Sequence, residues 1–502
     1  MDDFFEGKNS RPGHIVCGAD VRRDKWIERI GNAFSSSSVC VLRSSSGQGK
    51  SALLYRYAYE NWPPESTYIL QVLETNEQVE KVKNYLKFRR KIKLPILLLI
   101  DNAGFRTPHW PQIAQECSSL GFKILLSIRN EDWYRYSKEN LTHFEIVEPT
   151  LDLIEAKEIF KRFKEKGKIA HAVKSSEWAY EKIRDSRLFI EYIYLITHGQ
   201  MLEERLRDQI QQIINLREDA SKIELIRKIS LADILGVPII IDKLLEVVTV
   251  QGDRQDILLS LSDEYISINS ETASGLHLVR SNHLVKILHN KYPPMAKTAL
   301  SIIEFVPSPN IPTLISNALT VKEIDNDIFL AGLVEKYHDA DLDKIFVFLE
   351  GIFEGGERLL YEINQNLFEE AFNLQGSAGV NLLSWKFSPL PTKYLSNLNF
   401  QHLNKIAQKF VEKSRGLNLC HDFLAKIVPT ISKEKLASQQ KIGKLLNWCF
   451  LCNVKFPEWE FVKEEAIECK EIFGSNLDPI TDFSLGLCRY DEEMYVKWFL
   501  NY

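Results

Sequence analysis

Apolar and polar residues follow two different patterns along this chain. In the first 150 residues, short apolar runs without alternation stand at 39–42 and 94–100, and a third begins at 122 and ends at a polar tip by 130. Such runs are typical of parallel strands buried on both faces, and helical spacing separates them. Strands that alternate with helices predict an α/β domain on a parallel sheet, which we place at residues 1–150.

The pattern becomes mainly helical after the first domain. Residues 222–290 predict a helix, a second helix and a strand, at 223–229, 239–248 and 263–268. From about residue 290 onward, apolar residues recur at helical spacing between prolines and glycines. Examples are 299–305, 342–353, 442–451 and a last helix near 491–502 that ends on aromatic residues. The helices show no fixed repeat period. Their spacing nevertheless predicts an all-α, solenoid-like region at 291–502 with a long surface for a partner.

Composition narrows the class of protein. The 502-residue chain is 45% hydrophobic and 26% charged, with a net charge of −5. These values are typical of a soluble protein with several domains, and the charge does not favour nucleic acid or an anionic membrane. No apolar run reaches the length of a membrane span, and the acidic N-terminus lacks the pattern of a signal peptide. Eight cysteines in so long a chain suit a reducing compartment, so we expect a cytoplasmic protein.

The first apolar run leads into a glycine loop with the chemistry of a phosphate site. Residues 44–51 read Ser-Ser-Ser-Gly-Gln-Gly-Lys-Ser, between a predicted strand and a predicted helix. Backbone N–H groups of such a loop surround nucleotide phosphates, and the lysine reaches the β- and γ-phosphates. Ser44 replaces the first glycine of the usual P-loop pattern, and an ordinary strand-to-helix turn is the alternative. The expected nucleotide contacts are Gly47, Gln48, Gly49, Lys50, Ser51 and Ala52.

A carboxylate follows the second apolar run. Asp101 stands at the C-terminal end of the predicted strand 94–100, where α/β sheets bind ligands. We expect Asp101 and the Ser51 hydroxyl to hold Mg²⁺, although Asp101 could instead cap the next loop. The residue after Asp101 is Asn102, an amide and not a second acid. Because an amide can orient water but cannot take its proton, we expect slow ATP hydrolysis, with Lys50, Asp101, Asn102 and Arg129 as the catalytic set.

The third predicted strand ends in Ser127-Ile-Arg129. If the strands are parallel, this polar tip lies at the same sheet edge as Asp101. Arg129 could then sense the γ-phosphate, and a surface arginine is the alternative.

The order of these motifs resembles the STAND branch of AAA+-related P-loop ATPases, which includes NACHT and NB-ARC proteins. An upstream segment at 15–30, the glycine loop, the strand before Asp101 and the strand before Arg129 carry the resemblance. It implies adenine recognition by the backbone near Val16 and a phosphate-sensing role for Arg129. It also implies a helical lid at 151–220, entered through residues 144–156.

The same resemblance implies a winged-helix unit at 221–290. A histidine in this unit would contact the β-phosphate of ADP, with His277 the first choice and His283 the second. The alternative is an imidazole buried in a helical interface. The lid lacks the family's sensor proline, for which Arg187 could substitute.

These motifs predict a nucleotide-dependent switch that binds ATP or ADP with Mg²⁺. By resemblance, a protein ligand on the C-terminal helices would open the molecule and favour homo-oligomers, as in prokaryotic sensors that include antiviral ones. The alternatives are an AAA+-like remodelling ATPase with sustained turnover and a nucleotide-dependent DNA-binding regulator.

Two further signals are weaker. Cys449 and Cys452, with Cys469 and Cys488 downstream, could suggest zinc, but without a second close pair they are expected to be buried structural cysteines. The basic run at 81–93 could contact nucleic acid, but we expect the solvated face of a helix.

Overall fold

The chain forms two compact units, Met1–Tyr292 and Pro293–Tyr502. The computed structural model describes residues 10–73, 75–104, 107–130, 133, 143–215, 220–248, 253–262, 264–269, 271–290, 292–357, 366, 409, 414–431 and 439–456. The predicted helix at 491–502 and the residues Cys469 and Cys488 lie outside these ranges.

A five-stranded parallel sheet forms the centre of the first unit, which confirms the predicted α/β core. The strand order is β2-β3-β4-β1-β5, so β4 lies between β1 and β3. The strands are β1 (Val39–Ser44), β2 (Thr67–Ile69), β3 (Leu97–Ala103), β4 (Lys123–Arg129) and β5 (Phe144–Val147). Since all strands are parallel, the C-terminal ends of β1, β3 and β4 meet at one edge, where the polar residues of the sequence motifs stand.

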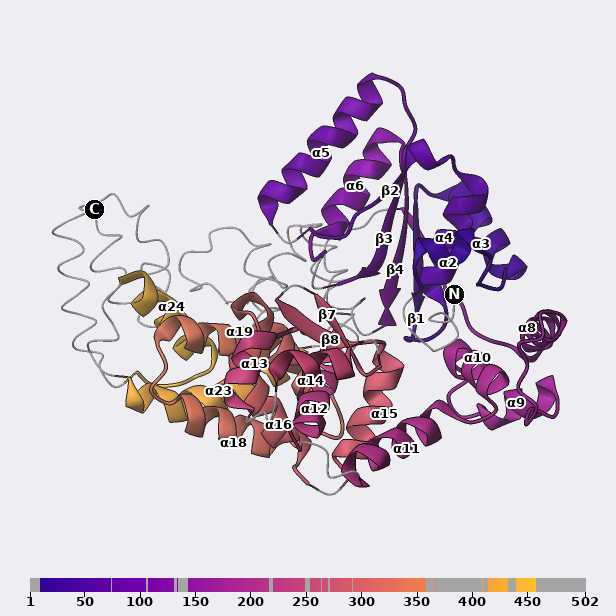
Figure 1. The fold of residues 1–502 in the computed structure, drawn as a ribbon. Coiled ribbons are helices and arrows are strands. Elements are labelled where there is room, and N and C mark those ends of the chain that lie inside the picture. The colour runs from indigo at the N-terminus through magenta and orange to yellow at the C-terminus, as the bar shows by residue number, and fades with distance from the viewer. Residues whose placement is uncertain are drawn as a thin grey trace. The chain divides into compact units, whose positions relative to one another are not determined.

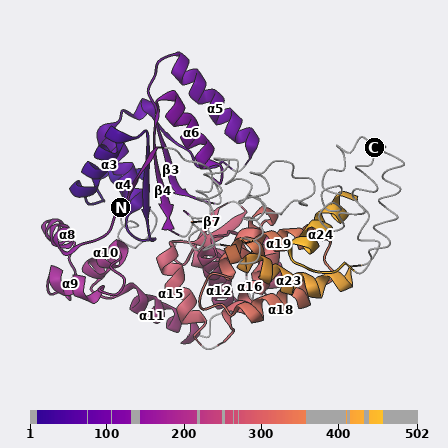
Figure 2. The same ribbon diagram turned by 180° about the vertical axis from the view of Figure 1, so that it is seen from behind.

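Helices cover both faces of this sheet (Figures 1 and 2). Side chains of β1 alternate between them: Val39 and Val41 pack toward α5 and α6, and Cys40 and Leu42 toward α3 and α4. Burial on both faces explains the unbroken apolar runs of the sequence. The helices are α3 (Asp24–Ser36), α4 (Lys50–Asn61), α5 (Asn76–Lys91) and α6 (Trp110–Leu120), preceded by the short α2 (Pro12–Val16). The basic run at 81–93 therefore lies mostly on α5, as expected.

Four helices follow the sheet. A compact cluster around Phe163, Tyr192 and Ile196 holds the first three together. Asp152 begins the first helix by accepting a hydrogen bond from the backbone N–H of Glu155 at 2.9 Å. The four are α8 (Leu153–Glu165), α9 (Ser176–Lys182), α10 (Phe189–His198) and α11 (Leu202–Asn215).

The last part of the first unit combines helices with a small antiparallel sheet of order β6-β8-β7. Its elements are α12 (Ala220–Ile234), β6 (Ile239–Ile240), α13 (Ile241–Val247), α14 (Arg254–Leu261), β7 (Ile266–Asn269), β8 (Thr272–Gly275) and α15 (Leu278–Leu288). The predicted helix at 239–248 starts only at Ile241, because Ile239 and Ile240 pair with β8. The predicted strand at 263–268 is β7, which begins at Ile266.

The described residues of the second unit form helices and short 3₁₀ turns, without a strand. The main helices are α16 (Met295–Ile302), α17 (Ile311–Ala318), α18 (Asn326–Tyr337), α19 (Leu342–Glu357), α23 (Arg415–Ile427) and α24 (Gln439–Leu451). A Cβ at Gly351 would lie 2.8 Å from Ile315 Cβ and 2.9 Å from the Pro312 carbonyl, so glycine permits the close approach of α19 to α17. Among the described helices of both units, none has the length and apolar composition that a membrane crossing requires.

Cys449 and Cys452 lie at the end of α24 and just after it. Both are buried, and burial raises the pKa of the Cys449 thiol above its ordinary value. Within the described ranges, no group of three or more His, Cys, Asp or Glu side chains is arranged to hold a metal ion.

Candidate functional site

The glycine loop connects β1 to α4 at the C-terminal edge of the parallel sheet. Gly47 and Gly49 both have positive φ, at 84° and 75°, a conformation that favours glycine. Ser44, in contrast, is still the last residue of β1 and pairs with Arg129 of β4. Its backbone is not in the left-handed region, so serine fits where the usual pattern has glycine.

The ammonium group of Lys50 lies inside this loop. Its Nζ donates hydrogen bonds to the carbonyl oxygens of Ser44 and Ser45, each at 2.8 Å. Lys50 is 8% exposed, so its positive charge is concentrated at the loop rather than solvated. Arrival of a phosphate would offer this charge a stronger acceptor than two carbonyl groups.

Asp101 is the centre of a hydrogen-bond cluster that joins three elements. Its Oδ1 accepts from the Ser51 hydroxyl of α4 at 2.9 Å and from the Ser127 hydroxyl of β4 at 2.7 Å. Its Oδ2 accepts from the Tyr55 hydroxyl at 3.1 Å. The adjacent carboxylate and hydroxyl oxygens of Asp101 and Ser51 are the ligand type that Mg²⁺ prefers, so these residues fit the ion.

The next residue, Asn102, has its side chain held by Arg129. Asn102 adopts φ of 53° where the pairing of β3 with β4 shifts between Ile100 and Ala103. Its backbone N–H donates to the Ser127 hydroxyl at 2.7 Å, and Arg129 Nε donates to its Oδ1 at 3.0 Å. The amide oxygen that could orient a water is therefore already engaged.

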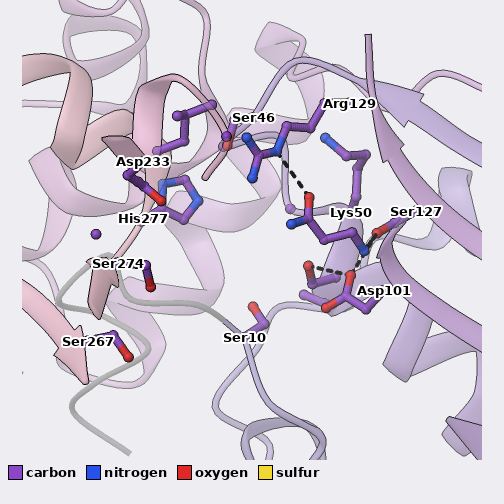
Figure 3. Close-up of a pocket in the computed structure, with 18 of the residues that line it drawn as sticks. Ser10, Ser46, Lys50, Asp101, Ser127, Arg129, Asp233, Ser267, Ser274 and His277 are labelled. Atoms are coloured by element: carbon purple, nitrogen blue, oxygen red, sulfur yellow. Dashed lines mark hydrogen bonds between the residues drawn. The ribbon is translucent and has the colours of Figure 1, made fainter. Parts of the chain in front are cut away.

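These groups open onto a cavity of about 540 Å³. That volume lies in the range of cavities that hold small ligands, roughly 300–1,000 Å³. Figure 3 shows Asp101 and Ser127 on one side of this cavity and His277 and Asp233 on the other. Residues from the sheet edge, α10 and the segment 233–278 contribute to the lining, all from the first unit.

His277 faces the cavity as a neutral imidazole. It precedes α15, and its Nδ1 accepts a hydrogen bond from the backbone N–H of Val279 at 3.2 Å. Its pKa is lowered to about 3, first by withdrawal from solvent and then by the positive charges of Arg129, Lys50 and Arg280. A neutral ring whose Nδ1 accepts carries its proton on Nε2, so His277 has one N–H to donate.

Asp233 of α12 is a second acid in the lining, and the sequence patterns gave no signal for it. Burial raises its pKa, although Ser281 donates a hydrogen bond to its Oδ2 at 2.7 Å. Gly275 makes this contact possible, because a Cβ there would collide with Ser281 Oγ and the Asp233 carboxylate. Asp233 therefore contributes to the packing between α12, β8 and α15 as well as to the cavity wall.

The glycine loop is also in direct contact with α10 and α15. The backbone N–H of Ile190 donates to the Gly47 carbonyl at 2.9 Å, and Gln48 Nε2 donates to the Arg187 carbonyl at 2.9 Å. A Cβ at Gly47 would lie 2.8 Å from Ile190 Cγ2 and 3.0 Å from Val279 Cγ2. The helices after the sheet thus cover the loop closely.

Arg23 connects the glycine loop to α8 and α10. Its guanidinium donates to the Gln48 carbonyl at 2.6 Å, to the Thr150 carbonyl at 3.0 Å and to both Glu155 oxygens at 2.5 and 3.0 Å. It also lies 4.6 Å from the ring centre of Phe189. The Arg23 and Glu155 side chains are 2% and 9% exposed, so this is a buried ion pair between the sheet domain and α8.

Comparison with known proteins places these motifs in a family. Residues 2–141 match the family model of novel STAND NTPase 5. Residues 2–141 are therefore a STAND-class P-loop NTPase domain. The match confirms the resemblance inferred from the sequence motifs.

Three solved structures resemble this STAND NTPase at low identity. A STAND protein with a tetratricopeptide repeat sensor from Pyrococcus horikoshii is 14% identical, with 96% of this chain and 84% of that chain covered and a TM-score of 0.34. A Walker-type ATPase of Pyrococcus abyssi is 13% identical, with 52% and 95% covered and a TM-score of 0.28. The ORC2 protein of Aeropyrum pernix, in ADPNP–ADP complexes, is 13% identical, with 56% and 93% covered and a TM-score of 0.27.

These TM-scores are low, so the family assignment rests on the match over residues 2–141. No curated protein matches the chain in sequence.

Most of the residues singled out from the sequence line the large cavity of the STAND NTPase. They are Gly47, Gly49, Lys50, Ser51, Ala52, Asp101, Asn102, Ser127, Arg129 and His277. Gln48 and Arg187 contact each other beside the loop instead, and the Arg187 side chain is exposed. His283 does not line the cavity; its Nε2 lies 2.9 Å from Glu191 Oε1 of α10.

Val16 is not brought to the site. It ends the short helix α2, is 62% exposed and lines neither described cavity. A second cavity of about 10 Å³, roughly the space of one water, lies beside Gly49 and Ala52. Asp20, Val21 and Arg23 line it, so the upstream segment approaches the loop several residues later than expected.

Tyr55 and Arg23 are site residues that the sequence analysis missed. Tyr55 follows Ser51 by one helical turn, so helical spacing could have indicated it. Arg23 stands in the upstream segment next to Arg22, and nothing in the local pattern distinguishes the buried arginine from the exposed one.

Proposed function

We propose that this STAND NTPase is a switch that holds ATP or ADP with Mg²⁺ at the loop Gly47–Ser51. The contact of Gly47 with Ile190 and Val279 carries the proposal, because one loop touches both α10 and α15. Phosphates bound to this loop would lie in the cavity that Lys50 and His277 share. Nucleotide affinity would then depend on how these helices are arranged.

Each side chain has a role in this proposal. Lys50 exchanges its carbonyl partners for the β- and γ-phosphates, and the loop N–H groups donate to the phosphate oxygens. Ser51 and Asp101 hold Mg²⁺, which neutralises phosphate charge when bound. His277 donates its Nε2–H to a phosphate oxygen, and Arg129 senses the γ-phosphate. The adenine base is recognised by the backbone of the upstream segment 15–30.

Slow hydrolysis is part of the proposal. Asp101 and Asp233 are the acidic residues of the described cavity lining. Asp101 is surrounded by hydroxyl donors, and Asp233 accepts from Ser281. Neither is placed as a base for water attacking a γ-phosphate at the loop, and Asn102 cannot accept a proton at neutral pH.

The remaining parts of the chain complete the switch. Residues 151–220 act as the lid, and residues 221–290 act as a winged-helix unit. A protein ligand of the helical region 291–502 favours an open form that exchanges ADP for ATP and assembles into homo-oligomers. We place this sensor in the cytoplasm, in a defence role such as antiviral response, by its likeness to prokaryotic sensors.

Such a switch has an energetic requirement. To move the closed and open forms from 1:99 to 99:1, a ligand must prefer one form by about 5.5 kcal/mol. A nucleotide that contacted only the loop could not provide this preference, because its affinity would be the same in both forms. Contacts to α10 and His277 would provide it.

The first test is nucleotide retention by the purified full-length protein. We expect ADP to be released on denaturation, at close to one per chain, and Lys50→Ala to abolish both this retention and the binding of labelled ADP. Lys174→Ala, at an exposed position in the same unit, is the matched control and should behave as wild type. Full ADP binding by Lys50→Ala would refute the site, and rapid multiple-turnover hydrolysis would favour the remodelling ATPase.

A further inference from the structure

The two carboxylate oxygens of Asp101 have different surroundings. Oδ1 is shared by the Ser51 and Ser127 hydroxyls, at 2.9 and 2.7 Å, and it lies toward the proposed metal ligand Ser51. Oδ2 accepts from Tyr55 at 3.1 Å. Ser51 can continue to donate its proton to Oδ1 while a lone pair of the same hydroxyl faces a metal ion. Three hydroxyl groups therefore fix the plane of the Asp101 carboxylate, and Tyr55 is the one that holds Oδ2.

The Tyr55 ring packs against two apolar clusters. Tyr55 is partly buried on α4, one turn after Ser51, and it packs against Ile15 and Ala19 of the segment around α2. It also contacts the cluster that holds α3 and α4 on the sheet. With its ring fixed in this way, the hydroxyl has little freedom to leave Asp101.

The phenol is also in the right protonation state to donate. The ordinary pKa of a tyrosine, about 10, lies far above neutral pH. Tyr55 thus stays neutral and adds no charge to the cluster. Its effect on Asp101 is one of orientation.

We propose that Tyr55 is a positioning residue for Mg²⁺: its hydroxyl donates to Oδ2 of Asp101 and so fixes the carboxylate that, together with Ser51, would hold the metal. The inference rests on the proposed nucleotide site and adds a residue to it. Groups that orient metal ligands without touching the metal typically change metal affinity by about 10- to 100-fold when they are removed.

The test is the Mg²⁺ dependence of ADP binding by full-length Tyr55→Phe. This variant keeps the packed ring and loses only the hydroxyl. We expect the Mg²⁺ concentration for half-maximal tightening of labelled ADP binding to rise about 10-fold or more. ADP affinity in EDTA should stay at the wild-type value, because Lys50 and the loop are untouched. Tyr59→Phe, one turn further along α4 and exposed, is the matched control and should match wild type in both measurements.

A double-mutant cycle separates orientation from packing. If Tyr55 acts through Asp101, Tyr55→Phe should not change the Mg²⁺ dependence further in an Asp101→Asn background. An unchanged Mg²⁺ requirement in Tyr55→Phe would overturn the inference. Equal losses of ADP affinity with and without Mg²⁺ would overturn it too, in favour of a packing role. Wild-type protein that binds no ADP in EDTA or in Mg²⁺ would instead refute the proposed function itself.

Discussion

The amide of Asn102 is engaged by Arg129, and this determines what a substitution there can do. Arg129 Nε donates to Asn102 Oδ1 at 3.0 Å. A carboxylate at position 102 would form an ion pair with the same guanidinium, which lowers its basicity. Introducing an acid at position 102 is therefore not sufficient to provide a general base for hydrolysis.

We expect Asn102→Asp to leave single-turnover ATP hydrolysis within a few-fold of wild type. A working general base typically contributes about 10²- to 10⁴-fold. Asn102→Asp combined with Arg129→Gln removes the ion pair, and this double variant controls for the role of Arg129. A rise of about 100-fold in Asn102→Asp alone would show that Arg129 does not restrain residue 102.

His277 makes the stability of the nucleotide-free protein depend on pH. In the unfolded chain a histidine takes up a proton near its ordinary pKa of 6.5, whereas in the folded protein the pKa of His277 is about 3. Acidification between these values therefore favours the unfolded state. From pH 7 to pH 5 this group alone should remove about 2 kcal/mol from the free energy of unfolding.

His277→Asn keeps an acceptor for the start of α15 and does not titrate in this range. We expect urea unfolding to show a smaller loss of stability from pH 7 to pH 5 in this variant than in wild type, by about 2 kcal/mol. His171→Asn, at an exposed position, is the control. Equal pH dependence in wild type and His277→Asn would contradict a neutral, buried imidazole.

The site residues that sequence could predict are those with a local signal. Lys50 and Ser51 belong to a short motif, and Asp101 and Arg129 stand at the ends of apolar runs that parallel strands bring to one edge. Val16 lies outside both described cavities, and the path of its segment depends on tertiary packing that a local pattern does not contain. Asp233 and Arg23 gave no local signal, since their partners lie far away in sequence.

At the scale of elements, one buried ion pair connects the sheet domain to the helices that follow it. Arg23 and Glu155 are withdrawn from water, while Lys25 and Asp152, a few residues away, form an exposed pair at 2.7 Å. Removing one partner of a buried pair leaves an uncompensated charge and costs about 3–5 kcal/mol. An exposed pair typically contributes less than about 1 kcal/mol.

Glu155→Ala should therefore lower the free energy of unfolding by about 3–5 kcal/mol, and it should also speed the release of labelled ADP. Lys25→Ala removes the neighbouring exposed pair and should change either quantity little. Denaturant unfolding and stopped-flow ADP release provide the measurements. Similar effects of the two substitutions would mean that Arg23 does not hold α8 against the loop.

The elements that sequence missed are the short ones. The strand β6 has two residues, too few for any periodicity, and its pairing with β8 is what makes it a strand. Longer elements such as β3, β4 and α19 were predicted, because continuous apolar runs or helical spacing extend over most of their length. Pairing between distant segments is the part that a local pattern cannot contain.

At the scale of the whole molecule, the proposed nucleotide site belongs to the first of two units. Every residue that lines the 540 Å³ cavity lies between Ser10 and Leu278. The described helices of the second unit bring no residue to it. Under the proposed switch, a ligand of the second unit would act by changing the balance between forms of the first, rather than by contacting the nucleotide.

Gly47 has a consequence for the timing of such a switch. The space that its missing side chain leaves is filled by methyl groups from α10 and α15, and Gly47 also lines the 540 Å³ cavity. Movement of the loop backbone therefore alters both contacts at once. Nucleotide escape and the parting of these two helices would then be a single kinetic event, with one barrier that governs both.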